Sequence, residues 1–351
     1  MNREELLKNI KDGEIISKLD FSGMDLSGAD LCGGIFEEVI FRGVNLAGAD
    51  LRESIFIKPE FSGANLSGVN MRSTVMTEAN LKGASLKNAE MVEAKLTEAD
   101  LSDADLAGAD LSTAALISAT LKNADLSNTN MDRTVLHEAN LQGANLSGAN
   151  LLQTVLMGAA LEGAEFTGAK LHLTMMLNVN LCGVNLSGMQ FTGVQFKGAD
   201  LTGVNFAKAD LTQASFMEAN LSGAVLDQAK AQYAIFMQAK MNNASLKGAF
   251  LKQTSFGEAD LTGADLSGAE MDSSVFEKAV CRAARFIGAN LTYCDFSHAD
   301  LSGADMSRAT LFRTKLHRVR DEHTRWDAAG KALALGTDPE RAEAENWQPE
   351  L

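Results

Sequence analysis

The sequence predicts a solenoid, a chain that coils and stacks upon itself. Three observations lead to this fold class: a five-residue period, the length of chain over which it runs, and the residue preferences at the other positions of the pentapeptide. In "ADLSDADLAGADLSTAALISATLKNADL", residues 99–126, a leucine recurs at every fifth position from Leu101 to Leu126. Neither a helix, with about 3.6 residues per turn, nor a strand, which alternates at about every second residue, places such a series on one side. A corner after every five residues would point all of these leucines towards one shared axis.

The five-residue period runs unbroken through most of the chain. Stepping from Leu101 in both directions reaches Phe21 and Leu316 without a change of register, which gives about sixty pentapeptides. Among these central residues only Ala231 and Cys281 are not Leu, Phe or Met. We therefore expect the central residues to form the core, where burying each side chain contributes about 1.5–3 kcal/mol.

The other positions of the pentapeptide also have preferences. The residue two before the centre is small, most often Ala, and the residue directly before the centre is often Asp or Asn, as at Asp100 and Asn140. The second residue after the centre is often Gly, as at Gly108 and Gly148, where a tight turn can use a positive φ. We expect the Asp and Asn side chains to form solvated, hydrogen-bonded ladders and not an acid/base site.

This A-(D/N)-L-x-x pattern resembles the pentapeptide repeat family, and the resemblance covers residues 19–318. It implies an all-β fold, a right-handed quadrilateral parallel β-helix with four pentapeptides in each square coil. The unbroken register then corresponds to about 15 coils.

A solenoid exposes its core at both ends and needs caps. Residues 1–18 are expected to form a helical N-terminal cap that uses Leu6, Leu7 and Ile10. Residues 319–351 are expected to form a C-terminal cap and an acidic tail, with Trp326 as the plug on the last coil. Within this segment residues 327–336 could form a short helix, and residues 337–351 are expected to be a loosely docked or disordered tail.

The sequence offers little chemistry of the kind that enzymes use. The four cysteines are scattered without CxxC spacing, and Cys281 and Cys294 fall at inward positions. His298, His317 and His323 lie near one end, but no convincing metal set accompanies them, so we expect surface histidines. We predict no catalytic residues, no metal and no cofactor.

The compartment and the charge narrow the partners. The start "MNREELLKNI" lacks the basic region followed by an apolar run that is typical of a signal peptide, so none is expected, and we expect no apolar stretch to span a bilayer. A bacterial cytoplasmic protein is the expectation, with secretion as an effector left open. The net charge of −15 opposes direct binding to nucleic acid, which would need a basic track.

One side of the predicted coil differs from the other three. This fourth face consists of the outward positions just before and just after the inward residues Phe36, Phe56, Met76 and their equivalents every twenty residues. Apolar residues gather in these positions, and a contiguous apolar patch usually marks an interface. We expect the following residues to contact a protein partner or a second copy of the chain: Ile35, Ile55, Ile57, Val75, Ile117, Val135, Val155, Met157, Met175, Leu177, Met217, Ile235 and Met237.

The function expected from these features is a non-enzymatic interaction scaffold or adaptor. The opening "LLKNIKDGEIISKLDFSGMDLSGADL" is also similar to the first coils of pentapeptide repeat proteins associated with type VI secretion, and this implies an accessory role there. The alternative is a DNA mimic that inhibits or protects type II topoisomerases, as implied by quinolone resistance members of the family. The acidic sign fits a mimic, whereas the even spread of charge and the apolar face do not.

Overall fold

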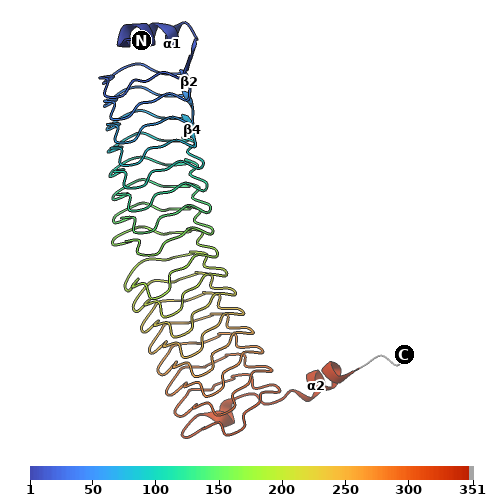
Figure 1. Cartoon of the computed structure of the whole chain (residues 1–351). Helices are drawn as coiled ribbons and strands as arrows, with labels where there is room; N and C mark the ends of the chain where they lie inside the picture. The colour runs from blue at the N-terminus through green and yellow to red at the C-terminus, as the bar shows by residue number, and fades with distance from the viewer. Residues whose placement is uncertain (348–351) are drawn as a thin grey trace. The chain divides into compact units, whose positions relative to one another are not determined.

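The computed structural model describes residues 1–347 and divides the chain into two compact units. The first unit covers residues 1–180, and the second begins at Leu181. Within each unit the chain winds in stacked coils, with helix α1 in the first unit and helix α2 in the second (Figure 1). Neither α-helix among the described residues has the length and hydropathy needed to cross a lipid bilayer.

The first unit begins with α1 (Arg3–Lys11), whose start is set by a capping box. The Asn2 side chain accepts a hydrogen bond from the Glu5 backbone N–H, and the Glu5 carboxylate accepts one from the Asn2 N–H. Leu6 is fully buried, whereas Leu7 and Ile10 are half-buried. The Arg3 guanidinium donates to the Ser27 carbonyl at 2.9 Å and so ties α1 to the first coils.

Four short strands follow in one parallel sheet in the order β1-β2-β3-β4. Their register places Ile16 opposite Phe36, Phe36 opposite Phe56, and Phe56 opposite Met76. Each step along the sheet is therefore twenty residues of sequence, four pentapeptides. The bounds of the strands are β1 (Ile15–Ser17), β2 (Ile35–Glu37), β3 (Ile55–Ile57) and β4 (Val75–Thr77).

The same twenty-residue step continues beyond the named strands as single parallel bridges. Examples are Asp100 with Thr120 in the first unit and Asp260 with Val280 in the second. Leu101 and the other central residues are buried, including the two exceptions Ala231 and Cys281. Parallel pairing with burial at every fifth residue confirms the predicted repeat β-helix.

The corners use backbone conformations that the sequence pattern anticipated. Gly108 has a φ of +72°, and a Cβ there would lie 2.5 Å from the Asn88 Oδ1 atom of the preceding coil. The Asp100 carboxylate accepts a hydrogen bond from the Ser102 N–H at 2.9 Å, which closes a turn. The Asn130 side chain donates to the Asp110 carboxylate one coil away at 3.1 Å. These bonds confirm the ladder interpretation of the Asp and Asn residues.

Buried hydroxyl groups form a second ladder at the small-residue position that leads into the fourth face. Thr134 Oγ1 donates to the Leu111 carbonyl and Thr154 Oγ1 to the Met131 carbonyl, both at 2.7 Å. Each of these side chains is fully buried. Because a buried hydroxyl without a partner is costly, these bonds allow Thr and Ser to replace Ala inside the coil.

The second unit closes with irregular structure and a helix. Its parallel bridges continue as far as the pair Lys315–Leu335. Trp326 is half-buried, with the Lys331 ammonium 4.2 Å from the centre of its ring. Of the short helix predicted over residues 327–336, only the 3-10 helix η1 (Lys331–Leu333) forms, because Leu335 pairs with Lys315 in the last parallel bridge.

Of the two alternatives expected for residues 337–351, a loosely docked or a disordered tail, the disordered one is wrong for part of the range. Helix α2 (Pro339–Asn346) forms there, with the Asp338 carboxylate accepting from the Arg341 N–H and proline as the first helical residue. Trp347, directly after α2, is 73% exposed. Residues 348–351, which the prediction also covered, lie outside the described residues.

Candidate functional site

In the first unit the fourth face carries two separate groups of apolar side chains. Ile35, Ile55 and Val75 are bridged in series, but the next residue in this column is Lys95. The column becomes apolar again at Ala115. The sequence pattern therefore predicted a more continuous apolar face than the structure has. The charged side chain of Lys95 separates the two groups, and the prediction did not take it into account.

The larger group is defined here as the apolar patch. Val135, Val155 and Met175 are bridged in series at the position before the inward residue. Met157 and Leu177 flank them at the position after it, with Met175 40% exposed. Ile117, 36% exposed, lies in the same column as Met157 with His137 between them in register. The predicted residues Ile117, Val135, Val155, Met157, Met175 and Leu177 are thus brought together on neighbouring coils.

Ile57, the most exposed of the predicted residues of this face, lies with the first group. Its side chain is 45% exposed and that of Ile55 is 38% exposed. Their neighbours at the position after the inward residue are Glu37 and Thr77, which are polar. This group is therefore narrower than the apolar patch.

In the second unit the fourth face is less apolar. Ile235 is bridged on both sides to serine, Ser215 and Ser255. Met237 and Val275 border a small hollow of about 130 Å³ that opens at Gly257, where the side chain is missing. The predicted residues Met217, Ile235 and Met237 are therefore grouped together but do not form a continuous column.

The structure adds exposed side chains that the sequence reasoning missed. Leu173, Tyr233 and Tyr293 occupy the corner position that precedes the fourth face, with φ between 56° and 62°. They are 42%, 52% and 52% exposed. A large apolar residue where the pattern usually has Gly, Asn or a charged residue is the signal that could have revealed them.

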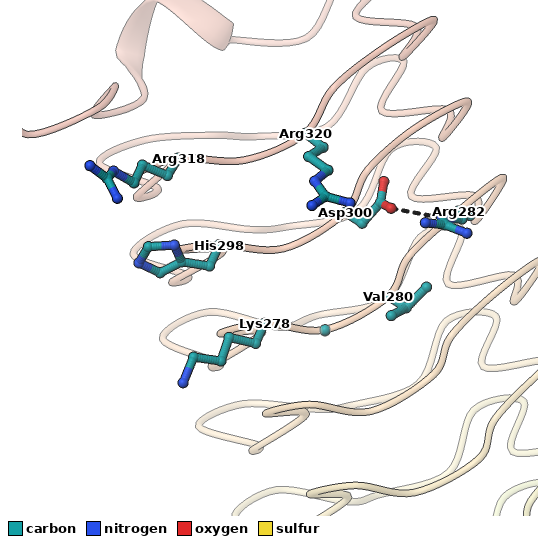
Figure 2. A pocket seen from close by; sticks show the side chains of 8 residues that line it. Lys278, Val280, Arg282, His298, Asp300, Arg318 and Arg320 are labelled. Carbon is teal, nitrogen blue, oxygen red and sulfur yellow. Dashed lines mark hydrogen bonds and ion pairs between the residues drawn. The ribbon is translucent and has the colours of Figure 1, made fainter. Parts of the chain in front are cut away.

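A shallow pocket of about 340 Å³ lies at the corner that follows the fourth face in the second unit (Figure 2). The Asp300 carboxylate accepts a hydrogen bond from Arg282 Nε at 2.7 Å, and its side chain is only 11% exposed. Val280 and Ala279 form the apolar part of the lining. The polar and charged residues of this basic pocket are Lys278, Arg282, His298, Asp300, Arg318 and Arg320.

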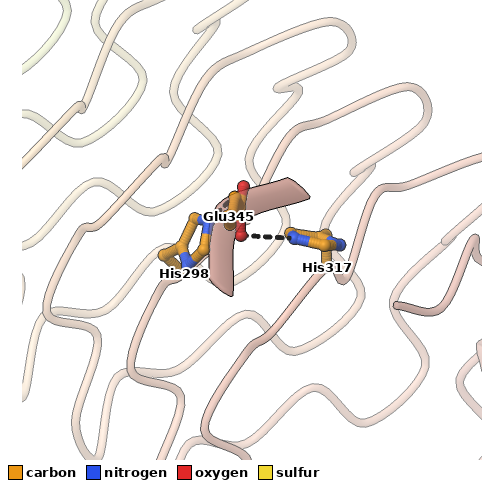
Figure 3. A group of neighbouring side chains, drawn as sticks. All are labelled: His298, His317 and Glu345. Carbon is orange, nitrogen blue, oxygen red and sulfur yellow. Dashed lines mark hydrogen bonds and ion pairs between the residues drawn. The ribbon is translucent and has the colours of Figure 1, made fainter. Parts of the chain in front are cut away.

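Helix α2 is held against the second unit by its Glu345 carboxylate, as Figure 3 shows. One oxygen lies 3.2 Å from His298 Nε2 and the other 3.1 Å from His317 Nε2. Arg341 and Arg318 approach the same carboxylate at 2.8 and 3.4 Å. The expectation of surface histidines is wrong for His317, which is 3% exposed, because α2 covers it.

Hydrogen bonds from its partners hold Glu345 in the charged form. The bond from His317, followed by those from Arg341 and His298, lowers the pKa of the Glu345 carboxyl to about 2 against the effect of desolvation. The carboxylate is therefore ionised over the whole physiological range. We call this arrangement of Glu345, His298, His317, Arg318 and Arg341 the α2 latch.

The α2 latch contains two imidazoles and a carboxylate within 4.8 Å of one another, a donor set that zinc could use. Two features oppose this use. His317 Nδ1 accepts a hydrogen bond from the Asp338 N–H, so the ring proton of neutral His317 is on Nε2, the atom that faces Glu345. Two arginines also neutralise the carboxylate. The chemistry of the donors favours a hydrogen-bonded latch over a cation site.

The two cysteine thiols inside the coil are unreactive because they are buried. Cys281 and Cys294 are buried, as the sequence pattern predicted. Burial raises the pKa of the Cys294 thiol to about 12 and raises the pKa of Cys281 as well. Because the thiolate is the nucleophile, neither residue is suited to catalysis.

Two sequence descriptions of pentapeptide repeats match this chain. "Pentapeptide repeat region" matches residues 189–266. No curated protein sequence matches the chain. "Pentapeptide repeats (8 copies)" matches more than half of the chain, over residues 20–56, 60–91, 94–133, 134–172 and 279–318.

Several solved structures are similar to parts of the chain. A pentapeptide repeat protein from the Arabidopsis thaliana thylakoid lumen is 37% identical over 30% of this chain and 67% of that one, with a TM-score of 0.25. HetL, a pentapeptide repeat protein involved in heterocyst differentiation regulation in the cyanobacterium Nostoc, is 24% identical over 90% and 96%, with a TM-score of 0.21. QnrB1, a plasmid-mediated fluoroquinolone resistance protein, is 20% identical over 56% and 97%, with a TM-score of 0.28.

Proposed function

Because this chain belongs to the pentapeptide repeat family, we propose that it is a non-enzymatic interaction scaffold that binds through the apolar patch of its first unit. A second copy of the chain is the occupant we favour, in the bacterial cytoplasm. The observation that carries the proposal is the series Val135, Val155 and Met175, bridged side by side on the surface of the first unit and flanked by Met157 and Leu177.

The position of the apolar patch within the repeat supports an interface, because strand propensity alone does not explain why these residues gather on one face. β-branched residues suit any strand, so propensity would distribute them over all four faces. The equivalent outward positions on other faces hold residues such as Asn140, Asn145 and Asn150. Methionine, at positions 157 and 175, is a side chain that adapts to the surface it meets.

A two-fold pair is the simplest arrangement that satisfies the patch. An isologous dimer sets the same patch of both copies against each other, so one set of apolar residues supplies both sides. Antiparallel pairing would bring Met175 of one copy towards Val135 of the other. No second apolar surface is then required.

Light scattering coupled to size exclusion tests this proposal. We expect wild-type protein to have the mass of a dimer, and the variant Val155→Asp, Met157→Ser, Met175→Asn and Leu177→Ser to have that of a folded monomer. A matched control replaces Val92 and Leu152, half-buried apolar residues of the neighbouring face, with Asn and Ser, and should remain dimeric. A variant that keeps the dimer mass would refute the patch, and a monomeric wild type would refute self-association and leave a different protein as the partner.

The finer setting that we propose is an accessory role in type VI secretion. It is supported by the similarity of residues 6–31 to the first coils of such proteins. The position of the coding sequence within or outside a secretion gene cluster tests it directly.

Inhibition of a type II topoisomerase is the second candidate function, because the net charge of −15 fits a mimic of DNA. The apolar patch opposes it, since rows of phosphates have no apolar counterpart. A gyrase supercoiling assay decides between the two. Inhibition at stoichiometric protein concentrations would favour the mimic, and its absence would favour the scaffold.

A further inference from the structure

The basic pocket of the second unit lies where one column of side chains changes from acidic and neutral residues to basic ones. At the second residue after each inward residue of the fourth face, the column contains Glu218, Gln238 and Glu258. It continues with Lys278 and then with His298 and Arg318. Equivalent residues of neighbouring parallel coils lie about 4.8 Å apart. The sign of the charge in this column therefore reverses over that distance, between Glu258 and Lys278.

This reversal brings like charges together, which is unfavourable unless an anion balances them. Among the described residues that line the pocket, Asp300 is the one carboxylate, and Arg282 already pairs with it. Arg318 pairs with Glu345 of the α2 latch. Within the described residues, Lys278 and Arg320 have no ion-pair partner within 4.0 Å, although both are exposed at the pocket. Two cations at the pocket therefore have no direct ion pair, in a chain of net charge −15.

The α2 latch shows what kind of group this part of the surface accepts. Glu345, on a helix rich in acidic residues, binds His298 and Arg318, and both of these also line the basic pocket. A further contact is the bond from the Arg318 guanidinium to the Ala342 carbonyl at 2.7 Å. The chain thus already seats one carboxylate of an acidic helix at the edge of the pocket.

We propose that the basic pocket binds the carboxylates of an acidic peptide segment of a partner protein, with Lys278 and Arg320 as the principal contacts. Arg320 supplies the planar donor fork that matches a carboxylate, and Lys278 supplies a flexible charge two coils away. Two coils correspond to about 10 Å, a distance that several successive acidic side chains can span. This site is independent of self-association through the apolar patch.

Fluorescence anisotropy with a labelled hexaglutamate peptide tests the proposal on the full chain in about 50 mM salt, where screening is moderate. We expect saturable binding to the wild type. The affinity of the double variant Lys278→Glu and Arg320→Glu for the peptide should be lower by about tenfold or by a larger factor, because two charged contacts are reversed. The matched control Lys230→Glu and Lys240→Glu makes the same change in net charge at exposed lysines of the second unit that do not line the pocket, and should bind like the wild type.

Equal weakening by both double variants would mean that only net charge matters and would overturn the proposal. The absence of saturation by hexaglutamate would also overturn it. Calorimetry with inorganic pyrophosphate distinguishes the other source of negative charge. Tight binding of pyrophosphate without binding of the peptide would identify a phosphate site and refute an acidic peptide as the ligand.

Discussion

The buried hydroxyl groups at the small-residue position that leads into the fourth face are satisfied through contacts between neighbouring turns. Thr154 donates to the Met131 carbonyl and Thr174 to the Leu151 carbonyl, a separation of 23 residues in each case. Each acceptor also accepts a backbone N–H from within its own turn, for example Thr134 N–H to Met131. The carbonyls therefore use both lone pairs, and a polar residue can replace Ala at this position without an orphaned hydroxyl.

Ala231, a small residue at a central position of the pentapeptide, leads to a prediction about the free energy of unfolding. Ala231 is fully buried between coils that have Leu211 and Leu251 at the equivalent position, and Tyr233 is directed outward at 52% exposure and does not fill the space. We predict that Ala231→Leu raises the free energy of unfolding by about 1 kcal/mol, because it restores buried apolar volume. Chemical denaturation measures this change.

Ala229→Leu is the matched control for Ala231→Leu. Ala229 is also fully buried, but it occupies the small-residue position of the pentapeptide. Overpacking there should destabilise the protein by about 1–3 kcal/mol. Destabilisation by Ala231→Leu of the same size as by Ala229→Leu would show that the coil has no free volume at residue 231.

The burial of single residues could be predicted well, and their polar contacts could not. A five-residue period identifies Leu101 and Cys281 as inward without any knowledge of their neighbours. The hydroxyl ladder of Thr134 and Thr154 depends on the offset between turns, which the pattern of small residues does not specify. His317 was misjudged for a similar reason, since its partner Glu345 lies 28 residues away in a segment without repeats.

The two α-helices differ in how they are attached to the coils. Helix α1 buries the apolar side chain of Leu6, whereas α2 buries no residue and is held by charged groups. The apolar residues Leu6, Leu7 and Ile10 recur at helical spacing in the sequence, and α1 was expected for that reason. The attachment of α2 depends on His298, Arg318 and Glu277, contributed by three separate coils, and no local pattern indicates it.

Helix α1 should behave as a lid on the first coils. We predict that Leu6→Ala lowers the free energy of unfolding of these coils by about 2–5 kcal/mol, because it leaves a cavity against a fully buried site. Hydrogen exchange of the amides in β1 and β2 reports the local loss. Leu7→Ala, at a half-buried neighbour, should have a smaller effect, and equal effects of the two would contradict the specific packing of Leu6.

The α2 latch should release when its carboxylate is neutralised. We predict that Glu345→Gln accelerates cleavage by trypsin after Arg341, because the ion pairs to Arg318 and Arg341 are lost. Mass spectrometry of the digest follows the cleavage. Glu343→Gln, on the same helix and exposed, is the control and should leave the rate unchanged.

Acid should release α2 in the same way. The folded pKa of Glu345 is about 2, below its ordinary value of 4.5, so its contribution is complete above 4.5 and is lost as the pH falls towards 2. The difference in hydrogen exchange of residues 339–346 between the wild type and Glu345→Gln should therefore be large near neutral pH and vanish near pH 2. A difference that is unchanged at the lower pH would contradict the role of this carboxylate.

Within each unit, the stacking of equivalent residues every twenty positions explains both the stability of the coils and the pattern of their surface. The same step aligns the inward Phe216, Phe236 and Phe256, whose rings stack at 4.7 and 5.0 Å. It also aligns outward residues, so each surface column is a short list of residues that can be read from the sequence. Two features limit what the columns predict about the surface. Lys95 interrupts an apolar column, and α2 covers part of the fourth face in the second unit.

Because every contact between turns depends on this step, a change of register is the most severe test of the fold. We predict that inserting one residue after Gly148 prevents soluble folding of the first unit, since Ala149, Leu151 and every later inward residue of that unit would face outward. Inserting a second copy of residues 129–148 adds one complete turn, keeps the inward positions and preserves the offset between Thr154 and the carbonyl it contacts. This control should remain soluble, with the same far-ultraviolet circular dichroism per residue as the wild type. If the single insertion folded and melted like the wild type, inward and outward positions would be interchangeable, and the register could not be what holds these coils together.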